Sequence, residues 1–549
     1  MLKYIHGFPH KDIKSAIHEH SIFLITSPSP PSLNFLASFR IPLPLQSLPS
    51  YPSISRLLSQ DIFSSIKMWF SNAPEYEART TWSSLPLTYR LNKPFAPPTV
   101  TLKEIHDAVP KELMRKDAIR SASYIVRDVI FCSLLMYFAC NIETMVRTGF
   151  WGYLPLSASW QMNTLRAVLW LWYWWWQGLV FTSFFCIGMY FRGGYLVCDR
   201  KSDNLFFGIF SLAHEMGHGA LFDSWYANNI TGFIMDSFIL VPFFAWKASH
   251  NAHHKAVGSV ERDENYVPYT RSDYKLPPQK AARWADYAEV FDETPIMTLS
   301  RLLIMQVFGW WLYLSCNAMG SKLHPEGTNH FSPYSPIFRK EQRWGIIASD
   351  IGLAAMTSLL SYVGFTYGGK TVLMYYFIPY MPRNSSLLRM GTFTVLCTFL
   401  HHSDPTIPHY RKEEWTFLRG AAATVDRPIL GWMGRFFFHN VSHDHVAHHF
   451  FSQAPFYNQP KITEAIRSVL KDDYNFDSTN SLYALYRSFT ECVFIEDEGA
   501  IVFYKNAEGE ASRQVADGVL QSPTSTSIKR KSLGAPDPRI VCISGDMLP

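Results

Sequence analysis

The most informative residues of this chain are histidines, because of how they are spaced. The 549-residue chain contains 20 histidines, and eight of them fall into three short motifs. The motifs are His214-Glu-Met-Gly-His218, His250-Asn-Ala-His253-His254 and His445-Val-Ala-His448-His449. Chance would give about 0.03 copies of H-x-x-H-H in a chain of this composition, and it has two. Side chains three and four residues apart share one face of a helix, so each motif can direct two or three ring nitrogens to one point.

These donors predict the kind of metal that the motifs would bind. Neutral imidazole binds Zn, Cu, Fe and Ni, whereas a site poor in carboxylates argues against Mg or Ca. Eight ligands exceed the four that a tetrahedral zinc ion takes. We therefore expect two metal ions.

Two other classes of protein share parts of this pattern. His214-Glu215 with His218 matches the helix of zinc metalloproteases, including intramembrane ones, in which the glutamate is the general base. Such a protease needs one further ligand and not two additional H-x-x-H-H motifs. A metal carrier is the second alternative, but transporter sites lie near the bilayer midplane, and these motifs flank the apolar segments.

Apolar segments long enough to cross a bilayer separate the motifs. A span needs about 20 apolar residues to cross ~30 Å of hydrocarbon. The candidates are Asp128–Met145, Ala167–Phe191, Leu302–Gly320 and Trp344–Thr366. We therefore predict an all-α, polytopic membrane protein with about four transmembrane helices in two hairpins, a cap that carries the histidine motifs, and interfacial helices.

Shorter apolar stretches decide on which side the motifs lie. Gly232–Trp246 is too short for a span, and we expect a half-buried interfacial helix there. An even number of crossings then separates the motifs, which places all of them in one compartment. Thr371–Leu400 is ambiguous, because Pro382–Ser386 interrupts its apolar runs. If that stretch crossed the bilayer, the third motif would lie on the opposite side.

Composition excludes nucleic-acid binding and a disulfide framework. The chain is 16% aromatic and only 17% charged, and its net charge of +5 is not gathered in a basic stripe. The eight cysteines form no C-x-x-C pair, and we expect inert buried thiols. Ser21–Thr26 is too short an apolar run for a signal peptide.

Several stretches resemble the membrane fatty-acid desaturases of the endoplasmic reticulum, in the fungal delta-12 (oleate) group. The resemblance extends from about Phe95 to Asn506 and is carried by Phe244–Pro268 (FAWKASHNAHHKAVGSVERDENYVP), Thr398–Tyr410 (TFLHHSDPTIPHY) and Phe438–Ser452 (FHNVSHDHVAHHFFS). It implies a di-iron centre on the cytosolic face and a cis double bond introduced at carbon 12 of an oleoyl chain. The resemblance also implies O2 as co-substrate, an acyl-lipid or acyl-CoA substrate, and electrons from cytochrome b5 and its reductase.

The resemblance also implies which residues bind iron. His402 matches the family's Q-H-x-[HD]-P motif and would be a ninth ligand, while Glu215 and Asp444, each beside a ligand, would orient imidazole rings. We expect no catalytic residue beyond the metal ligands. The motifs do not separate delta-12 desaturation from omega-3 desaturation, hydroxylation, acetylenation or conjugation. The implied ligands are His214, His218, His250, His253, His254, His402, His445, His448 and His449.

Other histidines have weaker claims to a metal. His439 and His443 lie close to the third motif, and we expect them to be structural or to support the ligands. Four more carry no ligand spacing, namely His106, His324, His330 and His409.

The chain divides into a desaturase domain and several less typical segments. Residues 126–455 form the predicted membrane desaturase domain, between a cytosolic region at 68–125 and a cytosolic C-terminal part at 456–506. Residues 1–67 form a low-complexity extension without a counterpart in the family, and 507–549 is predicted to be a flexible polar tail.

Two internal segments depart from the family. In the family Gln177–Thr182 would run directly into Gly208–Ala213, so we interpret residues 183–207, which contain polar groups unsuited to a span, as an insert or a retained intron. A family element with the pattern W-x-N-x-W is also missing after Ile378-Pro-Tyr380. Residues 382–397 are therefore either genuine protein or an error in the gene model.

Overall fold

The computed structural model describes residues 93–150, 152–154, 157–185, 190–192, 195–197, 207–208, 210–380 and 398–519, and within 179–209 and at Met433 it describes the backbone only. All described residues belong to the second of two compact units, Ser71–Pro549. The predicted extension 1–67, most of 183–207 and the segment 382–397 lie outside the described residues.

The described part of the chain is mostly helical, as predicted. Three of its helices are long and apolar enough to cross a membrane: α5 (Ala118–Arg147), α11 (Pro295–Cys316), and α12 (Arg343–Tyr367) together with the 3-10 turn η5 (Lys340–Gln342) that precedes it. They contain the predicted spans Asp128–Met145 and Trp344–Thr366 and most of Leu302–Gly320, whose last four residues follow the end of α11.

The fourth predicted span, Ala167–Phe191, is wrong at its C-terminal end. Its helix, α6 (Ser159–Ser183), stops before the short strand β1 (Phe184–Phe185), and it is not among the three candidate spans. The five-residue aromatic run Trp172–Trp176 makes up much of α6, and tryptophan and tyrosine favour the membrane interface over its centre.

The predicted interfacial helix Gly232–Trp246 is in fact two helices. α8 (Trp225–Phe238) and α9 (Phe243–His254) meet at a bend of 110°, and together they form one broken apolar segment. Leu240 adopts a left-handed backbone (φ 56°) and Pro242 precedes α9, so neither residue continues a helix. The bend turns α9, which carries the second histidine motif, away from the direction of α8.

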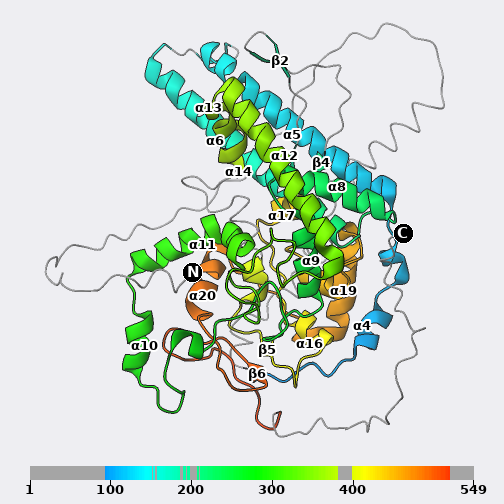
Figure 1. Cartoon of the computed structure of the whole chain (residues 1–549), viewed down its shortest axis with the longest axis vertical. Helices are drawn as coiled ribbons and strands as arrows, with labels where there is room; N and C mark the ends of the chain where they lie inside the picture. The colour runs from blue at the N-terminus through cyan, green and yellow to red at the C-terminus, as the bar shows by residue number, and fades with distance from the viewer. Residues whose placement is uncertain are drawn as a thin grey trace, which may run out of the picture. The chain divides into compact units, whose positions relative to one another are not determined.

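α5 and α6 pack along each other, and α12 packs on α8 and α9 (Figure 1). α5 begins at Asp117, whose side chain accepts a hydrogen bond from the Arg120 amide. Phe138 of α5 packs on Trp172 of α6 with ring centroids 4.6 Å apart. Gly352 of α12 leaves no room for a side chain against Phe233 of α8, so these two helices approach closely.

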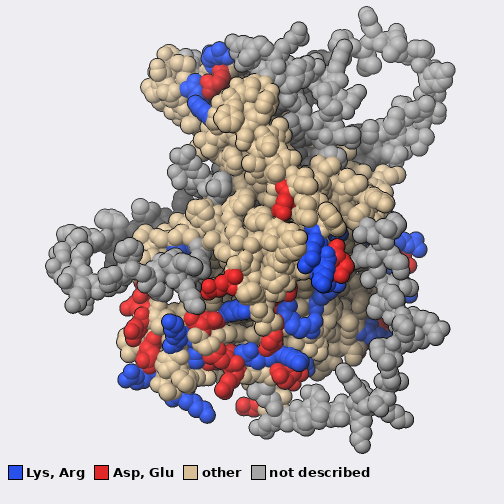
Figure 2. All heavy atoms as spheres, viewed as in Figure 1, with Lys and Arg blue, Asp and Glu red and all other residues tan. Residues whose placement is uncertain are grey.

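Charged side chains are unevenly distributed over the face shown in Figure 2. They gather over the region of α9, α10, α16 and α19, whereas the surface over α5, α6 and α12 is almost free of them apart from one end. Both α5 and α12 also carry exposed apolar residues, such as Leu134 and Phe365. This distribution is typical of helices that face lipid.

The remaining helices are short. They are α4 (Leu102–Ala108), η3 (Lys111–Met114), α7 (Phe210–Gly217), η4 (Ser272–Tyr274), α10 (Trp284–Phe291), α13 (Gly369–Val372), the π-helical turn η6 (Leu373–Phe377), α14 (Ile378–Tyr380), α16 (Phe417–Ala422), α17 (Trp432–Phe437), α18 (His445–Phe450), η7 (Phe456–Asn458), α19 (Gln459–Leu470), η8 (Lys471–Asp473) and α20 (Ser481–Glu491).

Three two-stranded antiparallel pairs complete the described elements. β1 pairs with β4 (Phe207–Gly208), β2 (Tyr190–Arg192) with β3 (Tyr195–Val197), and β5 (His409–Tyr410) with β6 (Ile501–Val502). Residues 507–519 also have defined contacts, since the Phe95 amide donates to the Gln514 carbonyl and the Ala516 amide to the Phe95 carbonyl. This part of the predicted flexible tail is therefore held against the chain's N-terminal side.

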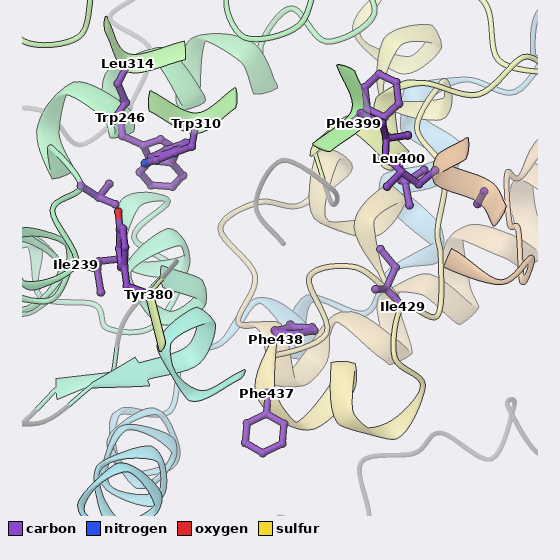
Figure 3. Packing of buried hydrophobic residues seen from close by; sticks show 14 of the residues in the cluster. Ile239, Trp246, Trp310, Leu314, Tyr380, Phe399, Leu400, Ile429, Phe437 and Phe438 are labelled. Carbon is purple, nitrogen blue, oxygen red and sulfur yellow. The ribbon is translucent and has the colours of Figure 1, made fainter. Parts of the chain in front are cut away.

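A hydrophobic core joins residues of the long helices to residues close to the histidine motifs, and Figure 3 shows part of it. In it, Trp246 of α9 lies near Trp310 and Leu314 of α11, while Phe399 and Leu400 come together with Ile429. Residues next to motif histidines, such as Trp246 and Leu400, are therefore held by packing, which restricts how the motifs can move.

Candidate metal centre

Four helical segments bring the motif histidines together. α7 carries His214 and leads into His218, α9 carries the second motif, and α18 carries the third. His402 comes from a fourth segment, the helical residues 398–402. α7 packs on α9, and α18 lies between α16 and α19. All of these histidines are buried except His250, which is partly exposed.

Five histidines form the first group: His214, His218, His250, His254 and His448. One ring nitrogen of each lies within 4.8 Å of the others. The His250 Nε2 atom lies 3.0 Å from His214 Nε2 and 3.1 Å from His254 Nε2. The group combines all three motifs: His214 and His218 come from the first, His250 and His254 from the second, and His448 from the third.

Three histidines form the second group: His253, His402 and His449. Their ligand atoms also lie within 4.8 Å of one another. His445 adjoins this group, because its Nε2 atom lies 3.1 Å from the Nε2 atoms of both His402 and His449. The nine histidines predicted as ligands thus lie in two neighbouring groups, five in the first and the other four in and beside the second.

Hydrogen-bond acceptors lie at the outer nitrogens of several rings. His214 Nδ1 lies 3.2 Å from a Glu215 carboxylate oxygen, and His218 Nδ1 lies 3.0 Å from the Asn251 side-chain oxygen. His253 Nδ1 lies 2.7 Å from Asp263. A ring that donates its Nδ1 proton outward keeps the Nε2 lone pair for the inside of the group.

The Nε2 atoms at the centre of the groups cannot all be paired by hydrogen bonds, because there are fewer N–H protons than nitrogen lone pairs. A neutral imidazole has one N–H, so His250 Nε2 cannot donate to two neighbouring nitrogens. Buried His218 Nε2 and His448 Nε2 have no hydrogen-bond partner among the described residues. Buried polar atoms without partners are costly, and a cation at the centre of each group would satisfy them. The two groups therefore fit metal ions, and only histidines make them up.

Burial keeps these rings neutral, as metal ligation requires. Burial lowers the pKa of His214 to about 3. Burial, and then the neighbouring histidines, lower the pKa of His402 and of His449 well below the ordinary value. A neutral ring at physiological pH offers a lone pair to a metal without first losing a proton.

The other predicted residues occupy different positions. His401 is stacked on His445 and its Nδ1 lies 2.5 Å from the Val425 carbonyl oxygen, so His402, and not His401, joins a group. Glu215 contacts His214 as expected, whereas Asp444 pairs with Arg435 at 3.0 Å. Two other histidines lie outside both groups: His439 lies 3.0 Å from Asp128, and His443 contacts Ser442.

The sequence analysis missed the acceptors Asn251 and Asp263. Asn251 lies within the second motif and Asp263 in the ERDEN stretch nine residues after His254, so both were visible in the sequence. Their spacing does not predict the contacts of Asn251 with His218 Nδ1 and of Asp263 with His253 Nδ1. His218 follows a different helix, and a turn brings Asp263 back to the second motif.

Comparisons with known proteins agree with this geometry. A family model for fatty acid desaturases matches residues 204–479, and a domain of unknown function, DUF3474, matches residues 72–136. The chain is 35% identical to an oleate hydroxylase from Claviceps purpurea, over 75% of this chain and 82% of that protein. It is 36% identical to delta(12) fatty acid desaturases from Mortierella isabellina and Mortierella alpina, each over 74% of this chain and 91% of the relative. The chain belongs to the fatty acid desaturase family.

Membership of the fatty acid desaturase family has two consequences. The desaturase is an oxidoreductase that acts on fatty-acyl chains, and the zinc-protease reading of His214-Glu215 with His218 is excluded. Its relatives include both desaturases and hydroxylases, which defines the family's chemistry but not the product of this chain.

Proposed function

We propose that this enzyme introduces a cis double bond at carbon 12 of an oleoyl chain. The observation that carries the proposal is the pair of neighbouring groups made of histidine alone, in a chain whose relatives are named for delta-12 desaturation. The second candidate is hydroxylation of oleate, which the Claviceps purpurea relative favours.

The two groups would hold two iron ions. His214, His218, His250, His254 and His448 would bind one, and His253, His402, His449 and the adjoining His445 the other. Bound iron would supply the redox chemistry with which O2, two electrons and two protons remove two hydrogens from adjacent methylenes, leaving an alkene and two waters. The chain's own residues hold the rings: Glu215, Asn251 and Asp263 orient imidazoles from outside.

Cytochrome b5 and its reductase would supply the electrons. The substrate would be an oleoyl group on a phospholipid or on coenzyme A. We place the enzyme in the endoplasmic reticulum membrane with its histidines toward the cytosol. α5 with α6 and α11 with α12 would form two hairpins, and the charge distribution in Figure 2 supports a membrane-embedded region over α5, α6 and α12.

Expression of the full chain in yeast that makes oleate but no linoleate tests the proposal. We expect linoleate in the total lipids, and the His448→Ala variant should make none. A 12-hydroxy product in place of linoleate would replace the proposal with the second candidate. An unchanged fatty-acid profile, with the protein present and iron bound, would contradict both.

A further inference from the structure

A line of polar side chains leads from the outer side of His250 to His330. The Tyr313 hydroxyl donates to the Asn265 side-chain oxygen at 2.8 Å and lies 3.0 Å from Ser249 Oγ. Ser249 Oγ lies 3.2 Å from His330 Nε2. The Asn265 amide nitrogen lies 3.5 Å from His250 Nδ1.

These residues come from separate parts of the chain. Ser249 and His250 are neighbours on α9, Tyr313 lies near the end of α11, and Asn265 and His330 lie outside both helices. Ser249 is 1% exposed and His330 is 0% exposed, and the His330 ring lies 4.3 Å from the Tyr313 ring. The His330 amide donates to the Leu314 carbonyl, which anchors this end of the line to α11.

His250 needs an acceptor at Nδ1 if it is to bind metal. Its Nε2 faces His214 Nε2 and His254 Nε2 at the centre of the first group. For that Nε2 to offer a lone pair, the ring proton must be on Nδ1. His218 and His253 meet this need with the oxygens of Asn251 and Asp263.

Asn265 can supply the acceptor when its amide is turned over. The oxygen and nitrogen of an asparagine amide are nearly isosteric, and their assignment follows from the hydrogen-bond network. With the oxygen toward His250, the amide accepts from Nδ1–H and donates to Tyr313. Tyr313 then donates to Ser249, whose own proton lies within reach of a backbone carbonyl of α9, 3.1 Å away, and of His330 Nε2.

We propose that Asn265, supported by Tyr313, Ser249 and His330, is a positioning residue that holds His250 with its Nε2 lone pair toward the first metal site. This inference rests on the proposed metal binding. It adds a supporting residue that no motif contains, and it ties the first group to the C-terminal end of α11.

The iron content of the purified full chain tests this inference. The protein is loaded with iron(II) alone, and iron loss to a ferrous chelator is followed over time. Asn265→Leu removes the acceptor while keeping a similar size, and we expect one of the two irons to be lost about 10–100-fold faster than from the wild type. Tyr313→Phe should show a smaller increase in the same phase.

Two matched variants complete the test. Asn265→Asp supplies a carboxylate acceptor, as Asp263 does for His253, and should restore wild-type retention of iron. Tyr376→Phe also removes a buried hydroxyl, one that donates to the Phe238 carbonyl at 2.6 Å, but away from both groups, and should release iron like the wild type.

The outcomes separate this inference from the proposed function. Wild-type iron release from Asn265→Leu, or release from Asn265→Asp as fast as from Asn265→Leu, would overturn the role of Asn265 while the proposed function stands. A wild-type chain that binds no iron would instead overturn the proposed function, and the inference with it.

Discussion

The rings of His254 and His449 are stacked, with centroids 4.1 Å apart and planes 18° apart. His254 belongs to the first histidine group and His449 to the second. The two groups are therefore in direct contact through one residue from the second motif and one from the third. Because of this contact, a change at either ring disturbs the packing of both groups.

Loss of any single motif histidine should abolish the product. We expect His253→Ala, His254→Ala, His448→Ala and His449→Ala each to reduce conversion below about a hundredth of wild type at near-normal protein level, a larger loss than the ~10–100-fold effect of losing a supporting residue. Lipid analysis measures the conversion, and immunoblotting measures the protein level. His443→Ala is the matched control, because His443 is equally buried but belongs to neither group, and it should keep partial activity. A motif variant with more than a tenth of wild-type conversion would not be a ligand variant.

Two natural glycosylation sequons, at Asn229 and Asn440, cannot report which side the histidines face. Asn229 and Asn440 are buried, and their side chains donate to the Trp225 and Phe456 carbonyls. Glu508→Thr creates a sequon at the half-buried Asn506, in a turn whose residue 508 is exposed, and it should remain unglycosylated in microsomes if the C-terminal part is cytosolic. An acceptor sequence inserted after Gly152, beside the 81% exposed Tyr153, should be glycosylated as the positive control. A glycosidase-sensitive shift from Glu508→Thr would reverse the proposed topology.

Residues 183–207 should be dispensable. The two ends of this segment already lie together, because Phe184 pairs with Gly208 and Phe185 with Phe207. Joining Thr182 to Gly208 would give ~22 mostly apolar residues before His214, about 33 Å of helix and enough for one crossing. We expect the deleted form to keep its activity in the yeast assay. An inactive deleted form beside an active full-length protein would show that the segment is required, and sequencing the transcript would show whether it is translated.

The ion pairs of Asp477 should make stability depend on pH. Burial alone would raise the pKa of Asp477, but the Arg427 charge and the hydrogen bonds from Thr479 and Arg487 together outweigh burial, so the pKa lies below the ordinary value. A carboxylate with a lowered pKa stabilises the fold above its unfolded pKa, near 4, and the contribution is lost as pH falls through the folded pKa. Asp477→Asn leaves Arg427 and Arg487 with Asp404 alone, and should lower the free energy of unfolding by about 3–5 kcal/mol at neutral pH.

Thermal unfolding of the detergent-solubilised protein between pH 7 and 3 measures this effect. The Asp477→Asn variant should be less stable at pH 7 and should lose less stability than wild type on acidification. Lys93 is the matched control, because its ion pair with Asp472 is about half exposed, and Lys93→Gln should change stability little. Parallel acid profiles for wild type and Asp477→Asn would mean that Asp477 does not carry the pH dependence.

Local spacing was enough to predict the membrane-type helices and the residues that gather at the centre. Offsets of three and four residues put His250, His253 and His254 on one side of α9, and long apolar runs predicted α5, α11 and α12. The same reasoning failed where one residue redirects the backbone. It did not predict the bend at Leu240 and Pro242, or the end of α6 at Ser183.

The sequence by itself determined which side chains are available to a metal, because the helix period depends only on the local backbone. Tertiary structure alone decided how they are shared. His448 joins His214 and His218 in the first group, whereas His449, its neighbour in the chain, joins His253 in the second. Adjacent residues on a helix point about 100° apart, so they reach different groups only because α7, α9 and α18 pack around one point. Asp263 and Asn265 lie beside the Nδ1 atoms of His253 and His250 for the same reason. Contacts between separate segments depend on packing, so no spacing in the sequence predicts them.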